Sequence, residues 1–244
     1  MAKSINSALL GKAIKDGFIT NLDQPVGDFY PQYAGSGMTV GDLSSMASGL
    51  DWEESYTSPF SVTSSSYYDD NLTETILNQK VIETPGKSYK YLSGNTQLLG
   101  MVIQKASGKS LSKYLTESFS EPMGFENEAL WQVDDAEHRL AKSYCCIASN
   151  AGGFVRFGKL YSNSGTWKSV SILDSSVVAT STRQRFNKSP EYGYGFWLSD
   201  HLNKKNLCNA RYYRAISNKD SRGQSYYCPT WSSAWWKVRN ALYR

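Results

Sequence analysis

With 244 residues, 40% of them apolar, the chain is long enough to bury one substantial core and has the composition of an ordinary globular protein. No stretch approaches the about 20 consecutive apolar residues that a transmembrane helix needs, so we expect no membrane span in this sequence. The sequence leaves the localisation of the protein open.

The formal net charge of +4 is unevenly distributed along the chain. Residues 201–244 hold nine Lys and Arg and a single acidic residue, Asp220, for a net charge of +8, whereas residues 1–200 carry a net charge of −4. Residues 207–244 alternate Tyr, Trp, Ser and Arg without a helical or strand period. We therefore divide the chain into a body, residues 1–200, and a basic aromatic tail, residues 201–244.

Apolar periodicity and capping residues predict that the body is mostly helical. The first helix ends at Asp16-Gly17, which is a C-terminal stop signal, and Thr39, Ser110 and Asp174 are candidate N-caps. The predicted helices span residues 4–15, 40–47, 72–78, 96–105, 110–117, 152–161 and 174–180.

Two stretches between these helices lack a helical period. Residues 18–33 are punctuated by Asp, Pro and Gly and predict a loop. The Ser/Thr/Tyr-rich residues 55–68 predict a surface excursion near a substrate cleft. Within the body, only residues 192–198 have the pattern of a β-strand.

The cysteines and histidines form no recognisable metal or triad pattern. The four cysteines lack zinc-ligand spacing, and since adjacent cysteines rarely bond to each other we expect Cys145-Cys146 to be buried free thiols. His138 and His201 lie far apart in the sequence without an evident carboxylate partner. We therefore expect no metal site, no cofactor and no Ser-His-Asp triad.

Two longer segments carry a family resemblance. Residues 85–100 contain Pro-Gly, alternating aromatic residues, the pair Tyr91-x-Ser93 and then Leu-Leu-Gly, and residues 39–52 contain Thr-x-x-x-Leu followed by Met-x-Ser-Gly-Leu. They resemble the β-lactamase-related serine hydrolases, which include class C β-lactamases, D-alanyl-D-alanine carboxypeptidases, related esterases and 6-aminohexanoate-dimer hydrolases. Further segments that match in the same order are Glu121–Phe125, Phe157–Tyr161 and Tyr192–Trp197, so the resemblance covers roughly residues 1–200.

The resemblance implies an α/β (α+β) fold of the serine β-lactamase type, in which a helical lobe packs on an antiparallel sheet. The family's early strands would precede the first helix of this chain. We therefore expect a mostly helical body from which the N-terminal strands are missing.

The resemblance also implies acyl transfer through a serine acyl-enzyme. In the family's Ser-x-x-Lys motif, serine and lysine lie one helical turn apart, and Lys3 fits the lysine, so the serine would fall one position before Met1. Tyr91 would relay the proton to the leaving group. The structural alternatives are a solvated terminal charge for Lys3 and a core aromatic residue for Tyr91.

Two residues near Tyr91 are candidates for substrate binding. Ser93 stands where many relatives have asparagine, which favours amide and ester hydrolases over β-lactamases because an amide would normally contact a peptide-like acyl side chain. Asn95 could supply the missing amide, and a turn or capping role is its alternative.

One complete Ser-x-x-Lys does open a helix, Ser110-Leu111-Ser112-Lys113, but we interpret it differently. It follows Tyr91 in the chain, whereas the family's motif precedes that tyrosine. Ser110 therefore fits an N-cap and Lys113 a solvated charge.

The family's third motif, a Lys-Thr-Gly or His-x-Gly triad, is absent from the sequence. Read from the third base of the Arg214 codon, the codons of residues 214–221 permit Gly-His-Lys-Gln-Gln-Gly-Gln, which resembles that motif. One hypothesis is therefore that the tail is translated out of frame. Its rival is a basic aromatic tail that binds nucleic acid or an anionic surface.

The sequence thus predicts a serine hydrolase lineage acting on small amides, esters or D-peptides, without a nucleic-acid partner. We expect the 244-residue chain itself to hydrolyse little or nothing, because the serine would precede Met1. The alternatives are a non-catalytic protein that binds peptides or cell-wall fragments, and a gene remnant that folds poorly.

Overall fold

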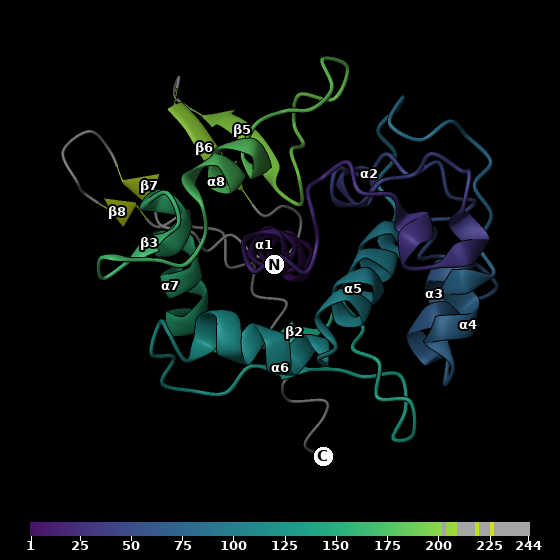
Figure 1. Ribbon diagram of the computed structural model, residues 1–244, viewed down its shortest axis with the longest axis horizontal. Helices are drawn as coiled ribbons and strands as arrows, with labels where there is room; N and C mark the ends of the chain where they lie inside the picture. Colours follow the sequence, from purple (N-terminus) through teal and green to yellow (C-terminus); the bar gives the residue numbers. More distant parts are fainter. Residues whose placement is uncertain (202–203, 209–217, 220–224, 227–244) are drawn as a thin grey trace.

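The computed structural model describes residues 1–201, 204–208, 218–219 and 225–226. Helix α1 lies in the middle of the molecule (Figure 1). Helices α2 to α5 lie on one side of it, helices α7 and α8 lie on the other side, and α6 lies below it in this view (Figure 1). Helices dominate the described residues and the strands form antiparallel pairs, which confirms the predicted fold of helices and antiparallel sheet.

The helices account for most of the regular structure. They are α1 (Ala2–Lys15), α2 (Val40–Ser44), α3 (Val62–Tyr68), α4 (Leu72–Leu77), α5 (Ser93–Ser107), α6 (Leu111–Leu115), α7 (Ala151–Ser162) and α8 (Ser175–Ser181). Short 3₁₀ turns at Val26–Asp28 and Pro31–Tyr33 and a π-helical turn at Thr116–Ser120 complete them.

The strands form four separate two-stranded antiparallel sheets within the described residues. The longest pair joins Trp197 to Cys208 and His201 to Lys204 across its ladder. The pairs are β1 (Leu130–Trp131) with β2 (Ile147–Ala148), β3 (Thr166–Trp167) with β4 (Val170–Ser171), β5 (Trp197–His201) with β6 (Lys204–Cys208), and β7 (Asn218–Lys219) with β8 (Ser225–Tyr226).

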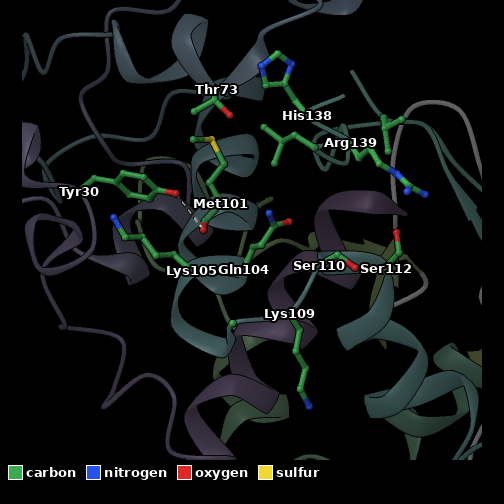
Figure 2. A pocket seen from close by; sticks show the side chains of 13 residues that line it. Tyr30, Thr73, Met101, Gln104, Lys105, Lys109, Ser110, Ser112, His138 and Arg139 are labelled. Carbon is green, nitrogen blue, oxygen red and sulfur yellow. Dashed lines mark hydrogen bonds between the residues drawn. The ribbon is translucent and has the colours of Figure 1, made fainter. Parts of the chain in front are cut away.

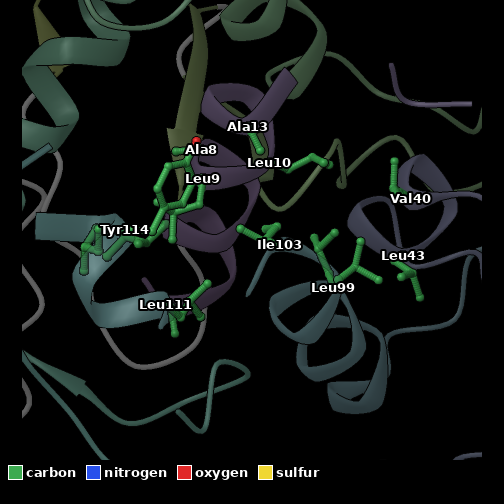
Figure 3. Packing of buried hydrophobic residues seen from close by; sticks show 14 of the residues in the cluster. Ala8, Leu9, Leu10, Ala13, Val40, Leu43, Leu99, Ile103, Leu111 and Tyr114 are labelled. Atoms are coloured by element: carbon green, nitrogen blue, oxygen red, sulfur yellow. The ribbon is translucent and has the colours of Figure 1, made fainter. Parts of the chain in front are cut away.

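Helix α1 is buried on nearly every side. Its apolar residues pack against α5 and α6, where Ala8, Leu9 and Leu10 meet Ile103 and Tyr114 (Figure 3). A helix that is buried all round belongs to the centre of a fold rather than to its surface. Helix α1 is therefore the element on which the others are assembled.

Three polar residues of α1, Ser4, Asn6 and Ser7, are buried too, and each donates a hydrogen bond across the fold. Ser4 Oγ donates to the carbonyl of Gly195 at 2.7 Å, and Ser7 Oγ donates to the carbonyl of Tyr194 at 2.6 Å. Asn6 Nδ2 donates to the carbonyl of Thr96 at 2.8 Å. These bonds tie α1 to α5 and to the segment that leads into β5.

Side-chain caps begin several of the helices, as the sequence predicts. Thr39 forms a reciprocal capping box with Asp42, and Ser110 caps α6. Asp174 is the N-cap residue of α8 but makes no capping hydrogen bond. Its carboxylate pairs with Lys15 at 3.1 Å, so an ion pair to α1 replaces the predicted cap.

All seven predicted helices are confirmed as helices, with shifted ends. Residues 55–68 are not wholly irregular, because α3 forms there with Ser61 as its side-chain cap and Thr63 and Ser66 buried. The strand begins later than predicted, at Trp197, because residues 192–196 form a turn closed by a bridge from Tyr192 to Trp197.

The expectation for the adjacent cysteines was wrong. Cys145 and Cys146 form a disulfide in a turn where Cys146 has a positive φ of 62°, and both are half-buried. Among the described residues, no helix combines the length and apolar character needed to cross a bilayer. The division into body and tail stays a prediction, because most of residues 201–244 lie outside the described part of the chain.

The start of α5 depends on a close approach by an aromatic ring. Gly94 is the second residue of α5, and a Cβ added there would lie 2.5 Å from Cε3 of Trp52. The ring of Trp52 is itself buried. Only glycine leaves room for the indole to lie against the helix backbone.

We expect Gly94→Ala to destabilise the fold by about 1–3 kcal/mol, because the added methyl group must displace the indole. Gly152→Ala is the matched control, since Gly152 is the second residue of α7 and its added Cβ would meet nothing closer than 3.4 Å. There the usual helix preference for alanine should leave stability unchanged or raise it by up to about 1 kcal/mol. Urea unfolding of both variants measures the difference, and equal effects would contradict the packing argument.

Candidate active site

Lys3 lies in the first turn of α1, with its side chain turned into the fold. Its Nζ donates a hydrogen bond to the carbonyl of Tyr144 at 3.1 Å and lies 4.8 Å from the centroid of the Tyr91 ring. Tyr91 stands two residues before α5 begins. The structure thus brings together the two residues that the sequence predicts as catalytic.

The surroundings of Lys3 favour its neutral form. Burial lowers the pKa of Lys3 from its ordinary value of 10.5 to about 8, while the negative charge of Glu54 acts in the opposite direction. A lysine with a pKa near neutrality is able to exchange a proton with a reacting group. A fully solvated terminal lysine would not show this shift.

The ring of Tyr91 belongs to an aromatic cluster. Its centroid lies 5.4 Å from that of Trp197 and 6.1 Å from that of Tyr192, with the Tyr192 ring nearly perpendicular to it. Such offset and edge-to-face contacts fix ring orientation. Burial raises the pKa of Tyr192 well above its ordinary value, with further increases from Tyr91 and Tyr89. Tyr192 therefore stays uncharged and packs against Tyr91 at one side of the site.

Ser93 is buried and bonded to an acid that the sequence analysis missed. Its backbone N–H donates to Glu54 Oε2 at 2.6 Å, and its Oγ donates to Glu54 Oε1 at 2.6 Å. Trp52 Nε1 also donates to Oε2, at 2.9 Å, and the Tyr56 hydroxyl donates to Oε1. Glu54 lies four positions after Leu50, in the stretch that leads to α3, and no local pattern in the sequence points to its contact with Ser93.

Asn95 lies away from this cluster, within the core. It is 0% exposed, and its side-chain amide accepts from Ser48 Oγ and contacts Met46 Sδ at 3.5 Å. These bonds join α5 to the turn at Met46, whose φ is 62°. These contacts fit the turn alternative that the sequence left open, and the substrate-binding role of Asn95 stays a prediction.

The second Ser-x-x-Lys has the geometry of a cap. Ser110 Oγ accepts from the backbone N–H of Lys113 at 3.3 Å, and the Lys113 side chain is exposed beside Glu117. This matches its interpretation as an N-cap followed by a solvated charge. His201 closes β5, and its side chain lies outside the described part of the structure.

His138 has a carboxylate partner that the sequence analysis did not find. Its Nδ1 lies 3.0 Å from Asp135 Oδ2, three residues earlier in the chain, and this pairing raises the pKa of His138. With Asp134, the two side chains offer ligand atoms within 4.8 Å of one another. The side chains are surface groups of one turn, and exposed acidic turns of this kind are common without a metal.

A hollow that does not include Lys3 lies on another part of the described structure. It has a volume of about 830 Å³ and lies between the C-terminal end of α5, the start of α6 and the turn at His138 (Figure 2). Two of its cationic side chains have partners: Lys109 pairs with Glu117, and Lys105 lies 4.6 Å from the centre of the Tyr30 ring. Neither Lys3 nor Tyr91 lines it.

A buried central helix that carries Lys3, set against the Tyr91 turn and the start of α5, defines a serine-hydrolase-like fold of the β-lactamase type. A family model described as Beta-lactamase matches residues 1–231. The chain therefore belongs to the β-lactamase family.

Individual relatives match at low identity. Protein flp of Staphylococcus aureus strain NCTC 8325 is 29% identical over 97 residues, which are 40% of this chain and 19% of that protein. The penicillin-binding protein homologue of Pyrococcus abyssi superposes with a TM-score of 0.60 at 18% identity, over 84% of this chain and 53% of its own. A D-stereospecific amidohydrolase of a Streptomyces species gives a TM-score of 0.57 at 18% identity, over 82% and 70%.

At these identities the structural likeness shows the fold alone. The chain spans about a fifth of the length of the curated relative and a little over half of the Pyrococcus abyssi chain. For this chain, the activity, substrates and partners of those proteins are therefore proposals.

The lowered pKa of Lys3 predicts a pH dependence of stability. Between about pH 8 and pH 10.5 the unfolded chain binds more protons at Lys3 than the folded chain does, so the free energy of unfolding should rise with pH. Below about pH 8 both the folded and the unfolded chain carry the proton, so the dependence of stability on pH through Lys3 vanishes. Lys3→Met removes this dependence.

The measurement is urea unfolding of the parent chain and the Lys3→Met variant from pH 7 to pH 9.5. The unfolding free energy of the parent chain minus that of the Lys3→Met variant should rise with pH, by up to about 2 kcal/mol at pH 9.5. Taking the difference cancels the ionisation of tyrosines, which both proteins share. Curves that stay parallel would show that Lys3 titrates as an ordinary solvated lysine.

Proposed function

We propose that this chain carries the lysine and tyrosine of a serine acyl-transfer site that acts on amide or ester bonds. The observation that carries the proposal is the approach of Lys3 Nζ to the Tyr91 ring, 4.8 Å from its centroid, in surroundings that bring the pKa of Lys3 to about 8. Membership of the β-lactamase family supports the same assignment.

In the proposed reaction a serine Oγ attacks the substrate carbonyl and its proton passes to the neutral amine of Lys3. The proton then reaches the leaving nitrogen or oxygen through Tyr91, the bond from the carbonyl carbon breaks, and an acyl-serine ester remains. Water attacks the carbonyl carbon of this ester, and one of its protons returns to the serine Oγ through the same pair. The bond from the carbonyl carbon to Oγ breaks and the acid is released. Lys3 and Tyr91 thus return to their starting states.

The serine of the family motif lies three positions before its lysine, which for Lys3 is one position before Met1. We propose that the 244-residue chain by itself hydrolyses little or nothing for this reason. Loss of the nucleophile from a serine hydrolase site removes most of the rate enhancement and leaves only binding effects.

Small amides, esters and D-peptides are the proposed substrates. Ser93 donates its hydroxyl proton to Glu54, so it offers a substrate only acceptor capacity at the place where many relatives have an asparagine amide. The name of the Streptomyces structure, a D-stereospecific amidohydrolase, supports an amide substrate. A protein that retains the cleft to hold peptides or cell-wall fragments without turnover is the alternative.

The test compares the 244-residue chain with an extended chain, in which an N-terminal segment from a β-lactamase-family relative ends in a serine directly before Met1. A fluorophosphonate probe, followed by mass spectrometry, should label the extended chain at that serine and leave the 244-residue chain unlabelled. Serine-to-alanine replacement in the extended chain is the control. Circular dichroism confirms that each protein is folded.

A stable adduct on the 244-residue chain would refute the missing-nucleophile proposal, and absence of label on a folded extended chain would refute the acyl-transfer site itself. Saturable binding of a D-peptide without turnover by the folded extended chain would favour the binding-protein alternative.

The role of Tyr91 gives a further prediction in the extended chain. Tyr91→Phe keeps the ring contacts with Trp197 and Tyr192 but removes the hydroxyl, so the acylation rate should fall by a factor of about 10²–10⁴. Single-turnover labelling measures the rate. Tyr89→Phe, which changes a neighbouring tyrosine of the same aromatic cluster, should leave it within about threefold. A similar loss in both variants would point to disturbed packing rather than proton transfer.

A further inference from the structure

We infer that Glu54 is a positioning residue of this site, whose carboxylate fixes the start of α5 and whose negative charge acts on Lys3. The inference rests on the proposed function, because it assigns Glu54 a task within the Lys3 and Tyr91 pair. Its structural part can be measured without any turnover.

The carboxylate of Glu54 is saturated with donors. Oε2 accepts from Trp52 Nε1 at 2.9 Å and from the backbone N–H of Ser93 at 2.6 Å. Oε1 accepts from Ser93 Oγ at 2.6 Å and from the hydroxyl of Tyr56. An ionised carboxylate has about four lone-pair sites, and these four donors fill them. Glu54 therefore holds its surroundings in place rather than serving as a spare proton acceptor.

Two of these bonds complete the N-terminus of α5. The N-cap residue, Leu92, has no side chain that can cap, so the first N–H groups of the helix need an acceptor from elsewhere. Glu54 supplies it to Ser93, the first residue of the helix. A carboxylate at this end also interacts favourably with the helix dipole. Tyr91 precedes the capped residue by two positions, so its place depends on this contact.

Glu54 is itself held rigidly. Trp52 Nε1 also donates to Thr63 Oγ1 at 2.8 Å, and Thr63 Oγ1 donates to the carbonyl of Glu53 at 2.6 Å. These bonds attach the segment before Glu54 to α3. The indole of Trp52 lies against Gly94, so the same segment also packs on α5. The carboxylate is thus fixed between two helices.

The charge of Glu54 also reaches Lys3. Burial disfavours the ammonium form of Lys3, and Glu54 is the group that opposes this effect. Without it, Lys3 would lose its proton at a lower pH. The arrangement balances burial against an opposite charge and leaves Lys3 able to both accept and return a proton near neutral pH.

The experiment replaces Glu54 by Gln and uses Glu53→Gln as the matched control. Glu53 is exposed, and Glu53→Gln changes the net charge by the same amount one residue away. The hydrogen bond from Thr63 to the backbone carbonyl of residue 53 is kept in this variant. The titration of Lys3 is followed by the pH dependence of its acetylation by acetic anhydride, read from the Lys3-containing peptide by mass spectrometry.

We expect Glu54→Gln to lower the pKa of Lys3 by about 0.5 unit or more, and Glu53→Gln to change it by less than about 0.2 unit. Glu54→Asp keeps the charge but shortens the side chain, so it should retain the pKa of Lys3 while loosening the four donors. If Glu54→Gln does not fold, the Glu54→Asp variant still tests the inference. In the serine-extended chain we expect Glu54→Asp to lower the acylation rate while the pKa of Lys3 stays unchanged.

Equal pKa values for Lys3 in the parent chain and the Glu54→Gln variant would overturn the inference, even if the variant is less stable. So would an acylation rate of the Glu54→Asp variant equal to that of the parent extended chain. If Glu54→Gln shifts the pKa of Lys3 but no serine-extended chain is acylated, the effect of Glu54 on Lys3 stands and the proposed function fails.

Discussion

Burial of α1 on nearly every side is the constraint on which the rest of the structure depends. A helix in this position must satisfy its polar side chains internally, since an unpaired buried hydroxyl or amide costs on the order of 1–3 kcal/mol. Ser4 and Ser7 meet this requirement through the carbonyls of Gly195 and Tyr194, and Lys3 does so through Tyr144. The hydrogen bonds that allow α1 to be buried therefore also place Lys3 in the candidate site.

Opposing effects meet at Lys3. Its burial favours the neutral amine, while the π face of Tyr91 and the charge of Glu54 favour the ammonium. Together the two effects leave the pKa of Lys3 at about 8. The carboxylate comes from the stretch before α3, the tyrosine from the turn before α5 and the amine from α1, so the balance exists only in the folded chain.

Much of this arrangement could be predicted from the sequence, and the failures have physical causes. The long helices follow from their apolar period, and the meeting of Lys3 with Tyr91 follows from the family resemblance. Helix α3 was missed because it has few apolar residues and is held by Ser61 and by the Trp52 indole. Glu54 was missed because its donors at Ser93 lie 39 positions along the chain, where no local pattern points to them.

The hydrogen bond from Ser4 to Gly195 spans 191 positions of the chain, and that from Ser7 to Tyr194 spans 187. Closing so long a loop carries a large entropic cost, and it can happen only after residue 195 has been synthesised. During translation the first helix emerges long before the backbone that completes it. Until then the apolar residues of α1 lack part of the surroundings that bury them in the folded chain.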